Sequence, residues 1–303
     1  MEYIVDTKKL TKRFGKEYAV KDLDMKIPKG EVYGFLGPNG AGKTTTIRML
    51  LGLMKPTTGT VSVFNKNLQK EKIEILRKIG SLVENPSYYP HLTAYENLES
   101  LRKILDVPKK RISEVLEIVR LTNATNKKVK GFSLGMKQRL GIAASLLHQP
   151  DLLILDEPTN GLDPSGIIEM RNLIKQLPAE YDMTILISSH LLAEIDQIAT
   201  SVGIISKGKM IFQDSIEEMR KLAQQNVILK VNDSEKAWQS LLAKGIQAEN
   251  KEGLVYMREQ SDQGIANAVR TLVQDGFSIY RVEEEKRSLE DIFLSMTSEG
   301  KLQ

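Results

Sequence analysis

A glycine-rich run in the first fifth of the chain has the residue types needed to hold a phosphate group. It reads Gly37-Pro38-Asn39-Gly40-Ala41-Gly42-Lys43-Thr44-Thr45. Glycines let backbone N–H groups close around phosphate oxygens, where a side chain would block them. The lysine can bridge the β- and γ-phosphates, and the hydroxyl of Thr44 is placed for Mg²⁺. The run predicts a P-loop that binds a nucleoside triphosphate, with Mg²⁺ as its companion ion.

A pair of adjacent acids follows the apolar run Leu152–Leu155. Asp156 can hold Mg²⁺ through water, and Glu157 is a candidate base for an attacking water. The alternative is that the two acids only open a loop, which Pro158 favours. We favour the metal-binding interpretation, because a P-loop fold needs a carboxylate on a neighbouring strand and no other apolar strand ends in adjacent acids.

The elements around these residues predict an α/β fold. A β-prone run at 31–36 precedes the P-loop, and apolar residues at helical spacing follow it. Continuous apolar runs predict further buried strands at 152–155, 184–188 and 201–205, with helices at 166–177 and 191–199 between them. This alternation is typical of a parallel sheet. The stretch from about 90 to 148 instead predicts an inserted helical subdomain, with helices at 95–105, 109–119 and 134–147.

The last part of the chain has a different order of predicted strands and helices. A helix at 215–225 is expected to close the first domain, which we place at 1–220, with an accessory domain at 221–303. The order of the predicted elements in the tail is βαββαβ, which matches a small ferredoxin-like α+β domain. Its strands are expected at 227–231, 246–249, 254–257 and 277–282, its helices at 235–243 and 264–274, and an extra helix at 289–297.

Composition excludes several classes of protein. The 303 residues contain no cysteine, so disulfides and thiolate metal sites are impossible. No apolar run approaches the roughly 20 residues of a membrane-spanning helix, and the N-terminus lacks the pattern of a secretory signal. The net charge of +4 comes from interleaved acids and bases rather than a basic face, so we expect no nucleic-acid partner. A cytoplasmic location is expected.

The stretch Phe132–Arg139 resembles the signature motif of ATP-binding cassette (ABC) ATPases. The resemblance spans residues 3 to about 215 and implies roles for matching positions. It places Phe14 against adenine, Asp156 on Mg²⁺ and Glu157 as the catalytic base, and His190 as the switch histidine. It also implies that Ser133 and Gly135 of one copy meet the γ-phosphate bound at the partner copy, beside the D-loop Asp163.

The implied assembly is a homodimer with two ATP sites that drives a separate membrane-embedded permease from the inner face of the cell membrane. Exposed aromatic residues suit interfaces, so Tyr88, Tyr89 and Leu92 are candidates for a socket that receives the permease. The alternative is that these three residues pack inside the helical subdomain.

Two positions depart from the family pattern. Leu134 and Met136 replace a glycine and a glutamine of the signature, and Glu84 stands where a metal-ligating glutamine is usual. Glu84 could still bind Mg²⁺. The chain resembles the bacitracin-resistance and lantibiotic-immunity branch of bacterial exporters in three features. These are the Glu84 substitution, the chain length and the tail sequence Ser288–Phe293. Exporters of other substrates and non-transport ABC ATPases remain alternatives, as does a ligand-sensing tail.

Overall fold

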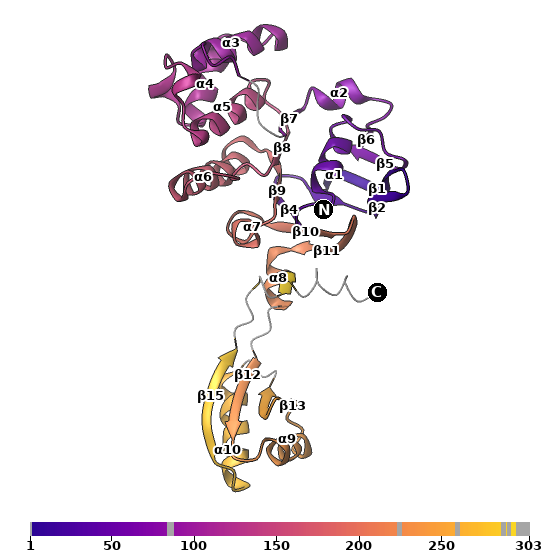
Figure 1. Cartoon of the computed structure of the whole chain (residues 1–303), viewed down its shortest axis with the longest axis vertical. Helices are drawn as coiled ribbons and strands as arrows, with labels where there is room; N and C mark the ends of the chain where they lie inside the picture. The colour runs from indigo at the N-terminus through magenta and orange to yellow at the C-terminus, as the bar shows by residue number, and fades with distance from the viewer. Residues whose placement is uncertain are drawn as a thin grey trace. The chain divides into compact units, whose positions relative to one another are not determined.

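The chain divides into two compact units. The computed structural model describes residues 2–83, 88–222, 226–257, 261–285, 289 and 292–294. The first unit is Met1–Ile216 and the second is Glu217–Glu299. The division falls at the start of helix α8 (Ile216–Leu222), close to the boundary that the sequence predicts at residue 220. Both units are drawn in Figure 1.

A six-stranded sheet forms the centre of the first unit, in the order β11-β10-β4-β9-β8-β7. Its strands are β4 (Val32–Leu36), β7 (Ile79–Leu82), β8 (Leu152–Asp156), β9 (Thr184–Ser189), β10 (Ser201–Ser206) and β11 (Lys209–Ser215). All neighbours pair in parallel except β10 and β11. The predicted α/β class is therefore confirmed. Strands β4, β9 and β10 are buried along their whole length, as expected where both faces of a sheet are covered.

A second, antiparallel sheet lies in the same unit, where the sequence analysis assigned no strand. It contains β1 (Tyr3–Phe14), β2 (Glu17–Leu23), β3 (Lys26–Pro28), β5 (Thr58–Val63) and β6 (Lys66–Asn67). Helix α1 (Lys43–Leu50) contacts both β2 and β8, so it lies between the two sheets. Leu10 of β1, Phe35 of β4, Ile47 of α1 and Ile154 of β8 belong to one fully buried apolar cluster. This core fixes the helix that follows the glycine-rich loop.

Helices α6 (Pro164–Tyr181) and α7 (Leu192–Ile198) contact β9 and each other, and α7 also contacts β4 (Figure 1). Asp163 caps α6 by accepting a hydrogen bond from the backbone N–H of Gly166 at 3.0 Å. Pro164 at the first helical position needs no N–H partner, so the start of α6 is sharply defined. The helix extends beyond the predicted range of 166–177 at both ends.

The predicted helical region is also present. It contains α3 (Ala94–Leu105), α4 (Lys110–Ile118) and α5 (Leu134–Leu146), with short 3₁₀ turns η1 (Thr122–Ala124) and η2 (Val129–Gly131), while α2 (Lys72–Leu76) precedes β7. The three longer helices pack pairwise against one another. Thr93 and Glu96 form a reciprocal capping box at the start of α3. None of the helices in the described part of the chain combines the length and apolar character that crossing a membrane requires.

The second unit has an antiparallel four-stranded sheet in the order β13-β14-β12-β15. Its elements are β12 (Asn226–Val231), α9 (Ser234–Ala243), β13 (Ala248–Lys251), β14 (Leu254–Met257), α10 (Asp262–Gln274) and β15 (Ile279–Glu285). The predicted order of strands and helices is confirmed. Most of the predicted helix at 289–297, and the end of the one at 215–225, lie outside the described residues.

Two strands of this sheet begin two residues later than the sequence predicts, for a shared reason. Ile246 and Phe277 each donate a backbone hydrogen bond of 2.9 Å to the preceding helix, to Leu241 and Leu272 respectively. Each follows a glycine with positive φ, Gly245 at 78° and Gly276 at 85°. This is the Schellman arrangement, which closes a helix and uses an apolar residue after the glycine. The apolar residue therefore belongs to a helix cap rather than to a strand.

Candidate active site

The glycine-rich loop joins β4 to α1 and has little room for side chains. A Cβ atom added to Gly37 would lie 2.4 Å from the carbonyl oxygen of Ile205, and one added to Gly42 would lie 2.5 Å from that of Ala19. Gly42 also has a φ of 112°, which side chains rarely adopt. The loop therefore requires glycine at both positions. Its shape leaves backbone N–H groups and the first turn of α1 available to an anion.

Lys43 begins α1, and only 5% of its surface is exposed. Its ammonium group donates to the carbonyl oxygen of Gly37 at 2.7 Å, so the side chain folds back over the loop. The next two residues, Thr44 and Thr45, are half-buried in the first helical turn. The predicted phosphate-binding residues thus lie together on one loop and one helix start.

The two predicted acids lie at the end of β8. Because β8 and β9 pair in parallel, Asp156 lies beside Ser188. The Ser188 hydroxyl donates to Asp156 at 2.5 Å and accepts from the backbone N–H of Glu157 at 3.0 Å. Glu157 has a left-handed backbone with φ of 48°, which turns the chain sharply after the strand. Sequence analysis did not single out Ser188, although its place at the end of a predicted neighbouring strand was a usable signal.

Two predicted site residues, Lys43 and His190, contact a third, Glu157. One carboxylate oxygen lies 3.3 Å from the Lys43 ammonium group, and the other lies 3.1 Å from Nδ1 of His190. A carboxylate accepts only, so His190 donates through a protonated Nδ1. The side chain of Glu157 is 23% exposed and that of His190 is 33% exposed. The arrangement places a carboxylate, an imidazole and a buried cation together at the ends of β4, β8 and β9.

Other predicted site residues lie at helix starts. Ser133 caps α5 by accepting from the backbone N–H of Met136 at 3.3 Å, and its side chain is exposed. Gly135 lies in the first turn of α5, and Asp163 caps α6. In the part of the chain that the structure describes, no hydrogen bond or ion pair joins these residues to Lys43 or Glu157. Ser133 and Asp163 are exposed polar residues at helix N-termini, whereas Gly135 is half-buried.

Phe14 ends β1 and is 52% exposed, with the Lys12 ammonium group 5.2 Å from its ring centre. A planar exposed ring of this kind can stack on a base. Glu84 lies outside the described residues.

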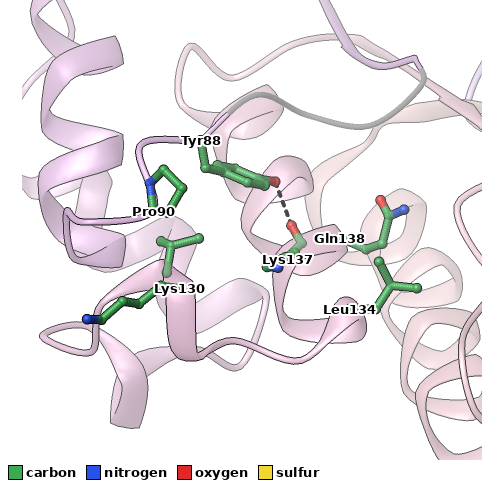
Figure 2. A pocket seen from close by; sticks show the side chains of 7 residues that line it. Tyr88, Pro90, Lys130, Leu134, Lys137 and Gln138 are labelled. Atoms are coloured by element: carbon green, nitrogen blue, oxygen red, sulfur yellow. Dashed lines mark hydrogen bonds between the residues drawn. The ribbon is translucent and has the colours of Figure 1, made fainter.

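A cavity of about 400 Å³ lies beside the start of α5 (Figure 2). It is lined by Tyr88, Pro90, Val129, Lys130, Leu134, Lys137 and Gln138. The Tyr88 hydroxyl donates to the carbonyl oxygen of Lys137 at 2.5 Å, the dashed line of Figure 2. Burial raises the pKa of this tyrosine well above its ordinary value, so the hydroxyl keeps its proton and remains a donor.

A larger groove of about 590 Å³ is lined by residues of α3, α5 and β7. Tyr89 lines the groove and is 59% exposed, whereas Tyr88 lines both the groove and the smaller cavity. The α3 side of the groove presents three further exposed apolar residues, Leu101, Ile104 and Leu105. Leu92 is only half-buried and does not line the groove. The groove has the apolar lining that an amphipathic helix would cover.

Comparison with known proteins identifies relatives. The family model described as ABC transporter matches residues 20–160. The chain is 46% identical to the bacitracin transport ATP-binding protein BcrA of Bacillus licheniformis, over 99% of both chains. It is 44% identical to the lantibiotic transport ATP-binding protein SrtF of Streptococcus pyogenes, over 73% of this chain and 96% of that protein.

A solved structure shares the fold of the first unit. It is the dimeric post-hydrolysis state of an ATP-binding cassette bound to ADP and Pi, with a TM-score of 0.62 and 28% identity. The match covers 70% of this chain and 98% of that one.

Proposed function

The chain belongs to the ABC transporter family as an ATP-binding protein and ATP hydrolase coupled to transport, and on that premise we propose that it powers an exporter of bacitracin- or lantibiotic-type peptides. The observation that carries this proposal is the similarity to BcrA over 99% of both chains, because it includes the C-terminal unit as well as the cassette. Similarity to SrtF, which covers 73% of this chain, adds the lantibiotic alternative.

Within the site, we assign the phosphates of ATP to the glycine-rich loop, Lys43 and Thr45, with adenine on Phe14. The Lys43 ammonium group and the backbone N–H groups in the first turn of α1 complement a polyphosphate. Since Lys43 already contacts Gly37 and Glu157, it exchanges these partners for phosphate oxygens when ATP binds. Binding therefore also releases one side of Glu157.

The residues present fit Mg²⁺. Magnesium prefers oxygen ligands and is usually held by one or two carboxylates together with substrate phosphates and waters. Asp156 supplies a carboxylate that Ser188 holds in place, and Thr44 supplies a hydroxyl. Glu84 is a further proposed ligand. When bound, the ion would neutralise charge on the β- and γ-phosphates.

Glu157 is the proposed general base for the attacking water, and His190 is proposed to hold it. The hydrogen bond from His190 Nδ1 fixes the position of one carboxylate oxygen. The other oxygen is free to accept a proton once Lys43 has moved to the phosphates. A carboxylate fixed by one partner and freed by the other suits proton transfer only after ATP is bound.

We propose that Ser133, Gly135 and Asp163 complete the site of a second copy of this chain. The exposure of Ser133 and Asp163 and the position of all three residues at helix N-termini support a role across an interface, and one solved relative is a dimer. ATP would then bind the closed dimer better than the open one and shift the population toward it. Hydrolysis would return the dimer to the open state.

The groove between α3 and α5 is the proposed contact with a membrane-embedded permease, which would hold the chain at the cytoplasmic face of the membrane. Its exposed apolar residues suit a helix of another protein. We also propose that the second unit is ferredoxin-like, because its element order and its sheet order both match that fold. Its proposed role is to support the dimer. No contact with nucleic acid is part of the proposal.

Replacing Ile104 by Asp tests the groove. A charge in an apolar contact is costly to desolvate. In cells that produce the protein, the amount of this variant in the membrane fraction should therefore fall, while the wild type remains there. Ile104 is 79% exposed, so the fold and ATP turnover in solution should be unchanged. Ile73→Asp is the matched control, since Ile73 is 74% exposed on α2, outside the groove. If Ile104→Asp remains in the membrane fraction to the same extent as Ile73→Asp, the groove is not the contact.

Deleting the gene in the producing bacterium tests the transport proposal. The deletion strain should become more sensitive to bacitracin or to a lantibiotic, and the wild-type gene should restore resistance. The Glu157→Gln gene should not restore it, because export would lack the ATP hydrolysis that is proposed to drive it. Unchanged sensitivity to every bacitracin- and lantibiotic-type peptide, with ATPase activity intact, would favour an exporter of another substrate.

A further inference from the structure

The first turn of α5 and the loop after Glu157 contact each other through a reciprocal pair of leucines and glycines. The Cδ2 atom of Leu134 lies 3.2 Å from the position that a Cβ on Gly161 would take. In return, Cδ2 of Leu162 lies 3.8 Å from the Cβ position of Gly135. Each leucine therefore covers the glycine of the other segment. Figure 2 draws the side chain of Leu134 as a labelled stick.

Leu134 is unusual for its position. Its side chain is 42% exposed at the start of a helix, so it contributes little to a hydrophobic core. The family resembled by this sequence usually has a glycine there, which could make no such contact. The side chain of Leu134 thus adds a contact between the signature segment and the loop after Glu157 of the same chain.

Backbone hydrogen bonds connect the loop that Leu134 contacts to Glu157. The backbone N–H of Asn160 donates to the carbonyl oxygen of Glu157, and that of Leu162 donates to Thr159, both at 3.1 Å. The Thr159 hydroxyl is buried and donates to Glu194 at 2.7 Å. Two successive tight turns therefore link Gly161 to Glu157, and a shift at one end reaches the other.

We propose that Leu134 is a positioning residue that holds the loop 157–163, and with it Glu157, in register with the signature segment of the same chain. This inference rests on the proposed roles of Glu157, Ser133 and Gly135. In a dimer, the signature segment meets the γ-phosphate of the other site. The Leu134 contact then transmits occupancy of one site to the base of the other, within a single chain.

Turnover of ATP by Leu134→Ala tests the proposal. Alanine keeps the helix start but removes the methyl groups that cover Gly161. We expect kcat to fall about 10-fold or more, since small displacements of a catalytic group are costly, while KM for ATP stays near the wild-type value. The Hill coefficient for ATP should fall toward one. Leu134→Met keeps the volume and should retain both kcat and cooperativity.

Ile73→Ala is the control for loss of an exposed apolar side chain, because Ile73 is 74% exposed on α2. It should leave kcat and cooperativity unchanged. Thermal unfolding of Leu134→Ala should match that of Ile73→Ala, which separates positioning from a loss of stability. If Leu134→Ala turns over ATP with unchanged kcat and Hill coefficient, the proposal is wrong.

A double-mutant cycle with Gly161→Ala gives an independent measurement. The added methyl group would meet Leu134 and would also sit at a φ of 75°, so Gly161→Ala alone should lower kcat. With Leu134→Ala in the same chain this tight contact of 3.2 Å is absent. Coupling residues give non-additive effects, so the double variant should turn over ATP no more slowly than the slower single variant. Purely additive losses would contradict contact between these two positions.

The Glu157→Gln variant keeps this test separate from the proposed function. If Glu157→Gln hydrolyses ATP normally, the assignment of the base fails. If Glu157→Gln is inactive but Leu134→Ala behaves as wild type, only the positioning role fails.

Discussion

Glu157→Gln is expected to lower the rate of ATP hydrolysis by about 10²- to 10⁴-fold, the usual contribution of a general base. Glutamine has nearly the same shape but cannot accept a proton from the attacking water. Its amide can still contact His190, which lies 3.1 Å from the carboxylate oxygen that it replaces. The variant should therefore keep its fold and lose the chemical step.

ATP binding by Glu157→Gln should be at least as tight as in the wild type. The Glu157 carboxylate lies 3.3 Å from the Lys43 ammonium group, so it would compete with phosphates for this group. Removing the negative charge frees Lys43. With binding intact and hydrolysis blocked, the variant should accumulate as an ATP-bound dimer, which size-exclusion chromatography with and without ATP would detect.

Glu117→Gln is a suitable control for this experiment, because Glu117 is an exposed carboxylate on α4. It should hydrolyse ATP at the wild-type rate and should form no lasting dimer. A wild-type rate in Glu157→Gln itself would show that another group activates the water.

The sequence proposes site residues most specifically where chemistry restricts residue types. The glycines of the loop, Lys43 and the acids after β8 are recognisable because few alternatives could do the same work. The structure brings Lys43, Glu157 and His190 together, although 33 residues separate the last two. Their pairing depends on the strand order β4-β9-β8, which the sequence pattern does not give.

Elements held by tertiary contacts were harder to predict. The antiparallel sheet that begins with β1 was missed, because β1 has adjacent buried residues and irregularities in register instead of the strict alternation that indicates a half-buried strand. Likewise, Ile246 and Phe277 look like strand residues but close helices, since the glycine before each one sets the chain direction. Local apolar pattern alone does not distinguish a helix cap from a strand start.

The start of α5 shows the same limit on the functional side. Ser133 and Gly135 are found by motif, but the role of Leu134 follows only from its position over Gly161. A residue that departs from the family pattern gives no signal of its new contact until the fold brings both segments together.

Lys43→Ala is expected to weaken ATP binding and to abolish most turnover. The Lys43 ammonium group lies over the glycine-rich loop and donates a hydrogen bond of 2.7 Å to the carbonyl oxygen of Gly37. A hydrogen bond to a charged group contributes roughly 1.5–3 kcal/mol, so the loss should weaken ATP affinity by about 10- to 100-fold. Isothermal titration calorimetry would measure it.

Turnover should fall further than affinity in this variant, because Lys43 has two tasks. In the proposed site it bridges the phosphates as charge develops between them, and its ammonium group also lies 3.3 Å from the Glu157 carboxylate. Without it, the Glu157 side chain loses this partner and keeps its contact with His190. Lys103→Ala on α3, where the lysine side chain is 69% exposed, should bind and hydrolyse ATP as the wild type does. If Lys43→Ala behaves like Lys103→Ala, the loop does not bind the phosphates, and the assignment of the whole site to ATP fails with it.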